Sequence, residues 1–192
     1  KGGYAANCEA AVSHDLMHKR SIFYVKGEYF VLHDLVLGEG EHQLEGVFHL
    51  APTFSPGDRA TKPGRVETFE GGIVRTAERD LSNIVVVSTD PANLKIRLER
   101  GTIASHDLIY MTKRPLPAAM NTVMFPLRPG AETGLDVKSV DVKADGDVLA
   151  TGFSIVYGEC MDVVLISDDG FAKMCTPDVQ FCGEYLFLRL DK

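Results

Sequence analysis

The chain has 192 residues, of which 45% are hydrophobic, and its formal net charge is -7, with 27 acidic residues against 20 lysines and arginines. This negative balance argues against a protein that grips nucleic acid through its overall field. The apolar runs are far shorter than the ~20 residues that a helix needs to cross a bilayer, so a membrane protein is not expected either.

Residues 1–17 show no regular hydrophobic period and contain neither an initiator methionine nor a signal-peptide core. This composition predicts a junction, either a linker or a short strand. We therefore expect a domain to begin at His18, and we expect either that the chain begins inside a longer protein or that it has been processed.

The stretch that follows predicts a three-strand meander. Residues 21–26 and Tyr29–Leu37 are rich in Val, Ile, Phe and Tyr and are separated by Gly27-Glu28; a second glycine-rich break precedes residues 42–50. The middle segment is apolar at odd and even positions alike, which predicts a strand covered on both faces.

Two polar residues interrupt that middle strand. A buried carboxylate without a partner costs several kcal/mol or more, so Asp34 requires an arginine, backbone N–H groups, a histidine or a metal. A hydrogen bond to Arg20 or to a loop is the simplest interpretation, and a metal site is the alternative. His33 is expected to be a core histidine with satisfied hydrogen bonds.

The length of the turn after residue 25 decides which side chains share a face with Asp34. A two-residue turn at Gly27-Glu28 places Asp34 opposite Ser21 and away from His18, whereas a three-residue turn or a bulge places it on the same face as His18. The sequence leaves both registers open.

The rest of the chain predicts further short strands, separated by Gly, Pro or Asp at short intervals and without helical periodicity. We predict an all-β fold, a two-sheet antiparallel β-sandwich of the supersandwich or jelly-roll kind, as one domain over residues 18–192. The expected strands are residues 66–69, 72–76, 83–88, 94–99, 107–112, 118–125, 139–143, 148–157, 161–167, 171–174 and 179–189.

The cysteines show no CxxC pair and no zinc-ribbon spacing, which argues against a redox motif or a cysteine zinc site. Cys175 and Cys182 are candidates for a hairpin disulfide if the chain is exported. Small buried residues are the simpler interpretation.

The order of motifs from His18 to Pro52 resembles the heparinase II/III-like polysaccharide lyases. The pattern is His-x-Arg, a strand, an aromatic after a turn, hydrophobic-hydrophobic-Asp, a Gly/Glu loop with a histidine, and Phe-His; the matching positions are His18, Arg20, Tyr29-Phe30, Val31 to Asp34, Gly38 to His42 and Phe48 to Pro52. Residues 113–130 and 158–167 also resemble later strands of that family.

The resemblance implies the C-terminal β-sandwich domain of a lyase that cleaves uronic-acid glycans, such as heparan sulfate or alginate, by β-elimination. It further implies an α/α-toroid domain ahead of residue 1, an acidic polysaccharide substrate and a periplasmic or secreted location. Because the toroid carries most of the proton-transferring groups in that family, we expect the 192 residues alone to be inactive.

The resemblance also implies site residues. The metal ligands of the family correspond to His18, Asp34 and His49, with His42 as an alternative third ligand, and a His/Asp/His set suits a structural zinc. Some members carry the cleft histidine two positions before the first ligand, where this sequence has Leu16, so His14 is the replacement candidate. Arg20, within the basic run from His18, is the candidate substrate-binding residue.

A different class of function stays open at this point, namely a stand-alone carbohydrate-binding or structural β-sandwich without catalysis. As a bare strand pattern, His49 falls on the face with Gln43 and Glu45, which favours a solvated side chain over a ligand.

Overall fold

The computed structural model describes the backbone of residues 3–13, 15–51, 64–101, 105–132 and 134–191, and the side chains from residue 15 onward. The chain divides into two compact units, Lys1–Glu132 and Thr133–Lys192. Each is built from antiparallel sheets, which confirms the all-β prediction.

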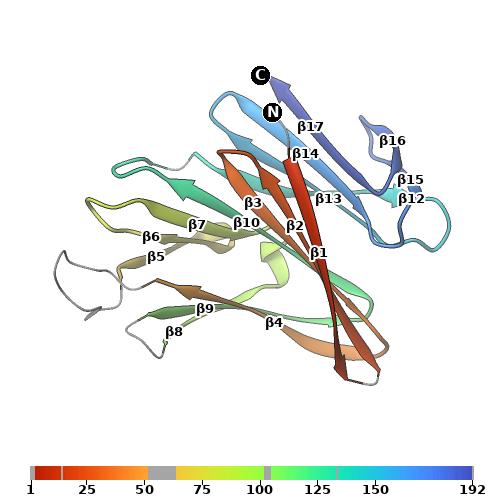
Figure 1. Ribbon diagram of the computed structural model, residues 1–192, viewed down its shortest axis with the longest axis horizontal. Helices are drawn as coiled ribbons and strands as arrows, with labels where there is room; N and C mark the ends of the chain where they lie inside the picture. The colour runs from red at the N-terminus through yellow and green to blue at the C-terminus, as the bar shows by residue number, and fades with distance from the viewer. Residues whose placement is uncertain (1–2, 14, 52–63, 102–104, 133, 192) are drawn as a thin grey trace. The chain divides into compact units, whose positions relative to one another are not determined.

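The first unit contains a seven-stranded and a three-stranded antiparallel sheet (Figure 1). The larger sheet has the order β1 (Gly3–Ser13), β2 (Leu16–Val25), β3 (Tyr29–Leu37), β10 (Ala118–Leu127), β7 (Asn83–Ser88), β6 (Ile73–Thr76) and β5 (Val66–Phe69). The smaller sheet has the order β4 (Glu41–Leu50), β9 (His106–Pro115) and β8 (Lys95–Arg100). Two short 3-10 turns, η1 (Glu70–Gly72) and η2 (Pro91–Asn93), connect strands.

Apolar side chains from both sheets of this unit form a shared core. Leu108 and Tyr110 of β9 pack with Val74 of β6 and Val86 of β7, all at most 1% exposed. The hydroxyl of Tyr110 lies 2.9 Å from the Gly72 carbonyl oxygen and 2.8 Å from that of Val86 and donates to them. Burial raises the pKa of the Tyr110 phenol, because the charged form loses its hydration.

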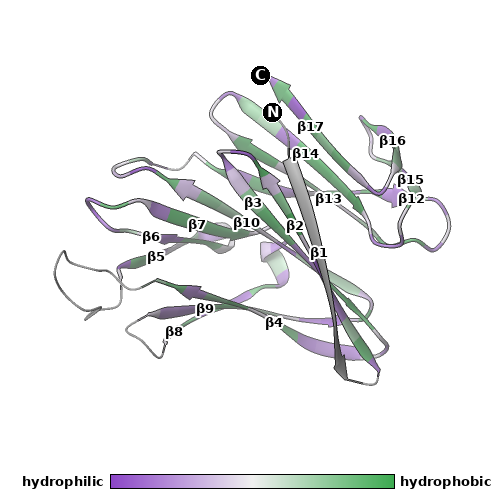
Figure 2. Cartoon of the chain, viewed as in Figure 1, coloured by the Kyte–Doolittle hydropathy of each residue, from purple (hydrophilic) through white to green (hydrophobic). Residues whose placement is uncertain are grey.

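The covered middle strand predicted around Asp34 is confirmed. Strand β3 has buried residues at consecutive positions from Val31 to Leu35, so both of its faces are covered. Its neighbour β10 and strand β14 of the second unit show the same dominance of hydrophobic residues (Figure 2). His33, 2% exposed, contacts Asn121 of β10 through Nδ1 at 2.6 Å from the amide oxygen, as expected for a satisfied core histidine.

The predicted meander is wrong in its third strand. Strand β4 pairs with β9 of the smaller sheet and not with β3. The connecting glycines, Gly38 at φ +151° and Gly40 at φ +83°, adopt conformations that other residues rarely take, and they let the chain leave one sheet and enter the other.

The amino-terminal segment forms a strand, one of the two structures predicted for it. Residues 3–13 form β1, which pairs with β2 from Gly3 opposite Val25 to Ser13 opposite Leu16, with one irregularity near its end. The sheet therefore extends on the amino-terminal side of His18, where we expected the domain to begin. A toroid domain ahead of the chain stays a prediction.

The second unit pairs a four-stranded sheet with a three-stranded one. The order of the first is β11 (Asp136–Val140), β13 (Ala150–Tyr157), β14 (Cys160–Ser167) and β17 (Tyr185–Asp191). The order of the second is β12 (Lys143–Ala144), β15 (Ala172–Cys175) and β16 (Gln180–Gly183). Val163 and Leu165 of β14 and Met174 of β15 form a buried core cluster of this unit. The single strand predicted over 179–189 is two strands, β16 and β17, in different sheets.

Cys175 and Cys182 are free thiols in this structure. Cys175 pairs with Gln180 and Cys182 with Lys173, so the two cysteines are not opposite each other in the ladder. Cys182 is exposed and Cys175 half-buried, and the prediction of small buried residues is therefore wrong for Cys182. Within the described part of the chain, no helix is long and apolar enough to cross a membrane.

Candidate functional site

The turn between β2 and β3 sets the register that assembles the site. Val25 pairs with Tyr29, so three residues form the turn, with Gly27 at φ +80°. This register places Arg20 directly opposite Asp34. His18 lies two residues from Arg20 along β2 and therefore on the same face, which is the outcome expected for a three-residue turn.

The Asp34 carboxylate binds both basic side chains. Arg20 donates from Nε to Oδ1 at 2.6 Å and from Nη2 to Oδ2 at 2.9 Å, and His18 Nε2 lies 2.7 Å from Oδ1. The Asp34 side chain is 12% exposed, against 39% for Arg20 and 32% for His18. A bidentate arginine is a strong partner for a carboxylate, so this cluster compensates the buried charge, as the simplest interpretation predicted.

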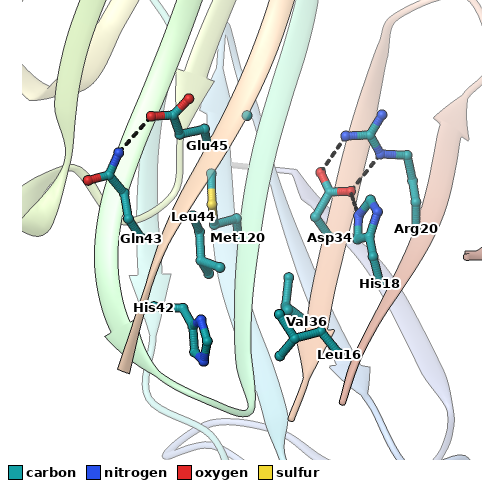
Figure 3. A pocket seen from close by; sticks show the side chains of 11 residues that line it. Leu16, His18, Arg20, Asp34, Val36, His42, Gln43, Leu44, Glu45 and Met120 are labelled. Carbon is teal, nitrogen blue, oxygen red and sulfur yellow. Dashed lines mark hydrogen bonds and ion pairs between the residues drawn. The ribbon is translucent and has the colours of Figure 1, made fainter. Parts of the chain in front are cut away.

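The cluster forms one wall of a hollow of about 220 Å³, which we call the Asp34 pocket. Figure 3 shows His18 and Arg20 reaching from β2 toward Asp34, with the side chains of β4 opposite them. The β4 wall carries polar groups, and Gln43 Nε2 donates to Glu45 Oε1 at 2.7 Å. The other lining residues are Leu16, Val36, His42, Leu44, Gly46 and Met120.

Of the three predicted zinc ligands, His18 and Asp34 come together, but His49 does not join them. His49 Nδ1 lies 2.8 Å from Asp107 Oδ1, its side chain is 74% exposed, and it lines a different hollow. His42 does line the Asp34 pocket, but its Nε2 lies 2.9 Å from the Glu39 carbonyl oxygen. Among the described residues no three His, Cys, Asp or Glu side chains are placed to hold an ion. The residues present therefore do not fit a three-ligand zinc site.

We expect the purified chain to unfold at the same temperature before and after treatment with a chelator. The reason is that Arg20 already supplies the positive charge beside Asp34, and a dication there would meet a like charge at close range. Elemental analysis and thermal unfolding check this. One zinc per chain, present in the parent and lost in Asp34→Ala, would contradict the expectation and restore the predicted site.

The other predicted site residues are His14 and Arg20. His14 lies outside the described residues. Arg20 lines the pocket, and its guanidinium holds Asp34. Sequence reasoning missed Met120, which pairs with Asp34 across β3 and β10, because nothing in the sequence shows that strands so far apart are neighbours. It missed Glu45 as a pocket residue because β4 was assigned to the wrong sheet.

The comparisons with known proteins agree with this architecture. A family model described as "Heparinase II/III-like, C-terminal" matches residues 4–132. No curated protein matches the chain.

Solved structures share the fold at low sequence identity. A heparinase III gene product aligns with a TM-score of 0.60 at 15% identity, covering 98% of this chain and 26% of its own. A heparan sulfate lyase of Pedobacter heparinus aligns with a TM-score of 0.62 at 12% identity, covering 85% and 26%. A further heparinase III aligns at 0.60 and 14%, covering 100% and 26%. The chain thus spans about a quarter of the length of these structures.

Proposed function

Because this chain belongs to the heparinase II/III-like family, through its C-terminal domain, we propose that it is the β-sandwich part of a polysaccharide lyase that cleaves uronic-acid glycans by β-elimination. The observation that carries the proposal is the family match over both sheets of the first unit, the unit that holds the Asp34 pocket. The glycan class, heparan sulfate-like or alginate-like, is part of the proposal.

β-Elimination needs a base for the C5 proton, an acid for the leaving oxygen and a group that stabilises the charge on the uronate. The Asp34 pocket offers His18, which Asp34 orients, and His42 on the opposite wall. Among its lining residues the pocket has no cation left for the uronate, since Arg20 donates two hydrogen bonds to Asp34. The remaining groups are assigned to an α/α-toroid domain that packs against this wall and completes the cleft.

The shared fold with much longer lyase structures supports this division of labour, because this chain corresponds to about a quarter of each. A polymer substrate further implies a periplasmic or secreted protein. The structural zinc that the family resemblance implies has no role in the proposed β-elimination.

A second candidate function is a carbohydrate-binding or structural module without catalysis. The observation that favours it is that the Asp34 carboxylate already has three hydrogen-bond contacts, two with Arg20 and one with His18. Such a paired carboxylate is typical of an ion pair with a structural role. Under this alternative the complete protein binds the glycan and leaves it intact.

The lyase assay separates the two functions. We expect the complete protein to release unsaturated uronate ends from at least one of heparan sulfate, heparin, hyaluronan and alginate, and the 192-residue chain to release none. The physical reason is that the Asp34 pocket, as lined by the described residues, supplies histidines but no uncommitted cation for the uronate charge, and the remaining groups are assigned to the toroid domain. Absorbance of the new carbon-carbon double bond measures the product.

Rapid turnover by the isolated chain would disprove the divided active site. A complete protein that binds a glycan without releasing unsaturated ends would instead establish the binding module.

A further inference from the structure

Two cysteines lie on one face of the sheet formed by β12, β15 and β16. In the ladder between β15 and β16, Cys175 is opposite Gln180 and Cys182 is opposite Lys173. Residues that are opposite each other in a ladder point to the same face, and so do residues two apart along a strand. Cys175 and Cys182 are therefore diagonal neighbours on one face of the sheet.

This face is turned to solvent. Met174, the residue before Cys175, points to the other face, where it is 0% exposed and packs in the core with Val163 and Leu165. Cys182 is exposed and Cys175 is half-buried. A reagent in solution can therefore reach Cys182 directly, with Cys175 beside it.

The diagonal spacing is close to the spacing that a disulfide requires. Diagonal neighbours on two antiparallel strands have Cα atoms about 7–8 Å apart, with the Cβ atoms nearer. A disulfide joins Cα atoms up to about 7 Å apart, so a shift of about 1 Å brings the two cysteines within reach. Strand β16 can make this shift because it is at the edge of its sheet, and among the described strands it pairs with β15 alone.

Cys160 provides an internal comparison. It begins β14 and is opposite Tyr157 on one side and Asp191 on the other. In the described ladders, therefore, Cys160 has no cysteine opposite or diagonal to it, and a second thiol follows the first only at Cys175 and Cys182.

We propose that Cys175 and Cys182 form a redox-sensitive dithiol, which a small-molecule disulfide such as glutathione disulfide oxidises to a disulfide that links β15 to β16. The thiolate of Cys182 attacks one sulfur of glutathione disulfide, forms a mixed disulfide and releases one glutathione. The thiolate of Cys175 then attacks Sγ of Cys182, closes the protein disulfide and releases the second glutathione. Two electrons pass from the cysteines to the reagent, and the two cysteine protons end on the released glutathione thiols.

The second step is favoured because Cys175 is already held beside the mixed disulfide, so the attack is intramolecular. The product ties the edge strand β16 covalently to its single described neighbour. This inference does not depend on the proposed function, and its test leaves the lyase assay unaffected.

Oxidation of a chain that keeps only this pair tests the proposal. In the Cys8→Ser/Cys160→Ser variant, incubation with glutathione disulfide should consume both remaining thiols and leave no glutathione attached. Peptide mapping without reductant should find Cys175 linked to Cys182 within one chain. Should this variant fail to fold, the same mapping of the parent chain decides, because the link must form there in preference to any link with Cys160.

Cys175→Ser in the same background is the matched control. It allows the first step and blocks the second, so a glutathione adduct should accumulate on Cys182. Thermal unfolding of the reduced proteins should show both variants folded. Separate glutathione adducts on Cys175 and Cys182, disulfides that join two chains, or thiols that stay reduced would each overturn the proposal.

Discussion

Asp162→Ala is expected to destabilise the chain by about 3–5 kcal/mol, the cost of leaving the partner of a buried ion pair uncompensated. Asp162 of β14 is 0% exposed, and Arg189 of β17 lies directly opposite it in the ladder. Arg189 donates to both carboxylate oxygens, from Nε and from Nη2, each at 2.7 Å. The substitution therefore removes charge compensation from a fully buried position.

The surroundings of Arg189 fix its geometry. Its guanidinium lies 5.7 Å from the ring centroids of both Tyr157 and Phe187, and Nη2 also donates to the Tyr157 hydroxyl. Without Asp162 this cation loses both of its hydrogen bonds to the carboxylate, in a site where its side chain is 22% exposed. Thermal unfolding should therefore show a midpoint lower by roughly 10 °C.

A double variant separates lost charge compensation from lost packing. Asp162→Leu combined with Arg189→Met removes both charges and should recover most of the stability, because an apolar pair needs no compensation. Lys138→Ala, at the exposed pair with Asp136, is the surface control and should change stability by less than about 0.5 kcal/mol. A single Asp162→Ala variant as stable as that control would show that the pair contributes little.

The sequence was sufficient for the fold class because alternation and turn residues are local signals. Most strand positions follow from β-branched and aromatic runs bounded by Gly, Pro or Asp. Pairing is a long-range property, and there the sequence was insufficient. Nothing local to His42–Leu50 shows that this strand joins residues 106–115 instead of its predecessor.

The candidate site shows the same division. That Asp34 needs a partner follows from its place within an apolar strand, and Arg20 was named from the sequence as one candidate. Whether His18 shares a face with Asp34 depends on the length of the turn between β2 and β3. The residues Gly27-Glu28 are compatible with a two-residue or a three-residue turn, so the sequence does not fix that length. His49 was chosen as a ligand from family resemblance, and the sheet that carries it places it against Asp107.

Under the proposed lyase function, Asp34→Asn in the complete protein is expected to lower kcat/KM for the cleaved glycan about 100-fold. The amide keeps the shape of the carboxylate, but it turns one acceptor into a donor that faces Arg20 and removes the charge that holds His18. A displacement of about 1 Å in a group that positions the substrate is enough for a loss of this size. Steady-state kinetics with product absorbance measure it, alongside the unfolding temperature.

The split between kcat and KM shows how Asp34 acts. If it positions His18 for proton transfer, kcat falls and KM changes little, whereas a change confined to KM would mean that the cluster only shapes the binding wall. Arg20→Lys keeps the charge and loses the two-point contact, so an intermediate loss is expected. Glu99→Gln, at the exposed pair with Arg97 on β8, should leave the kinetics unchanged. If Asp34→Asn leaves kcat and KM unchanged, as Glu99→Gln should, in a protein that is still folded, then the Asp34 cluster has no role in the reaction. The proposed cleft wall would then lie on another face of this unit.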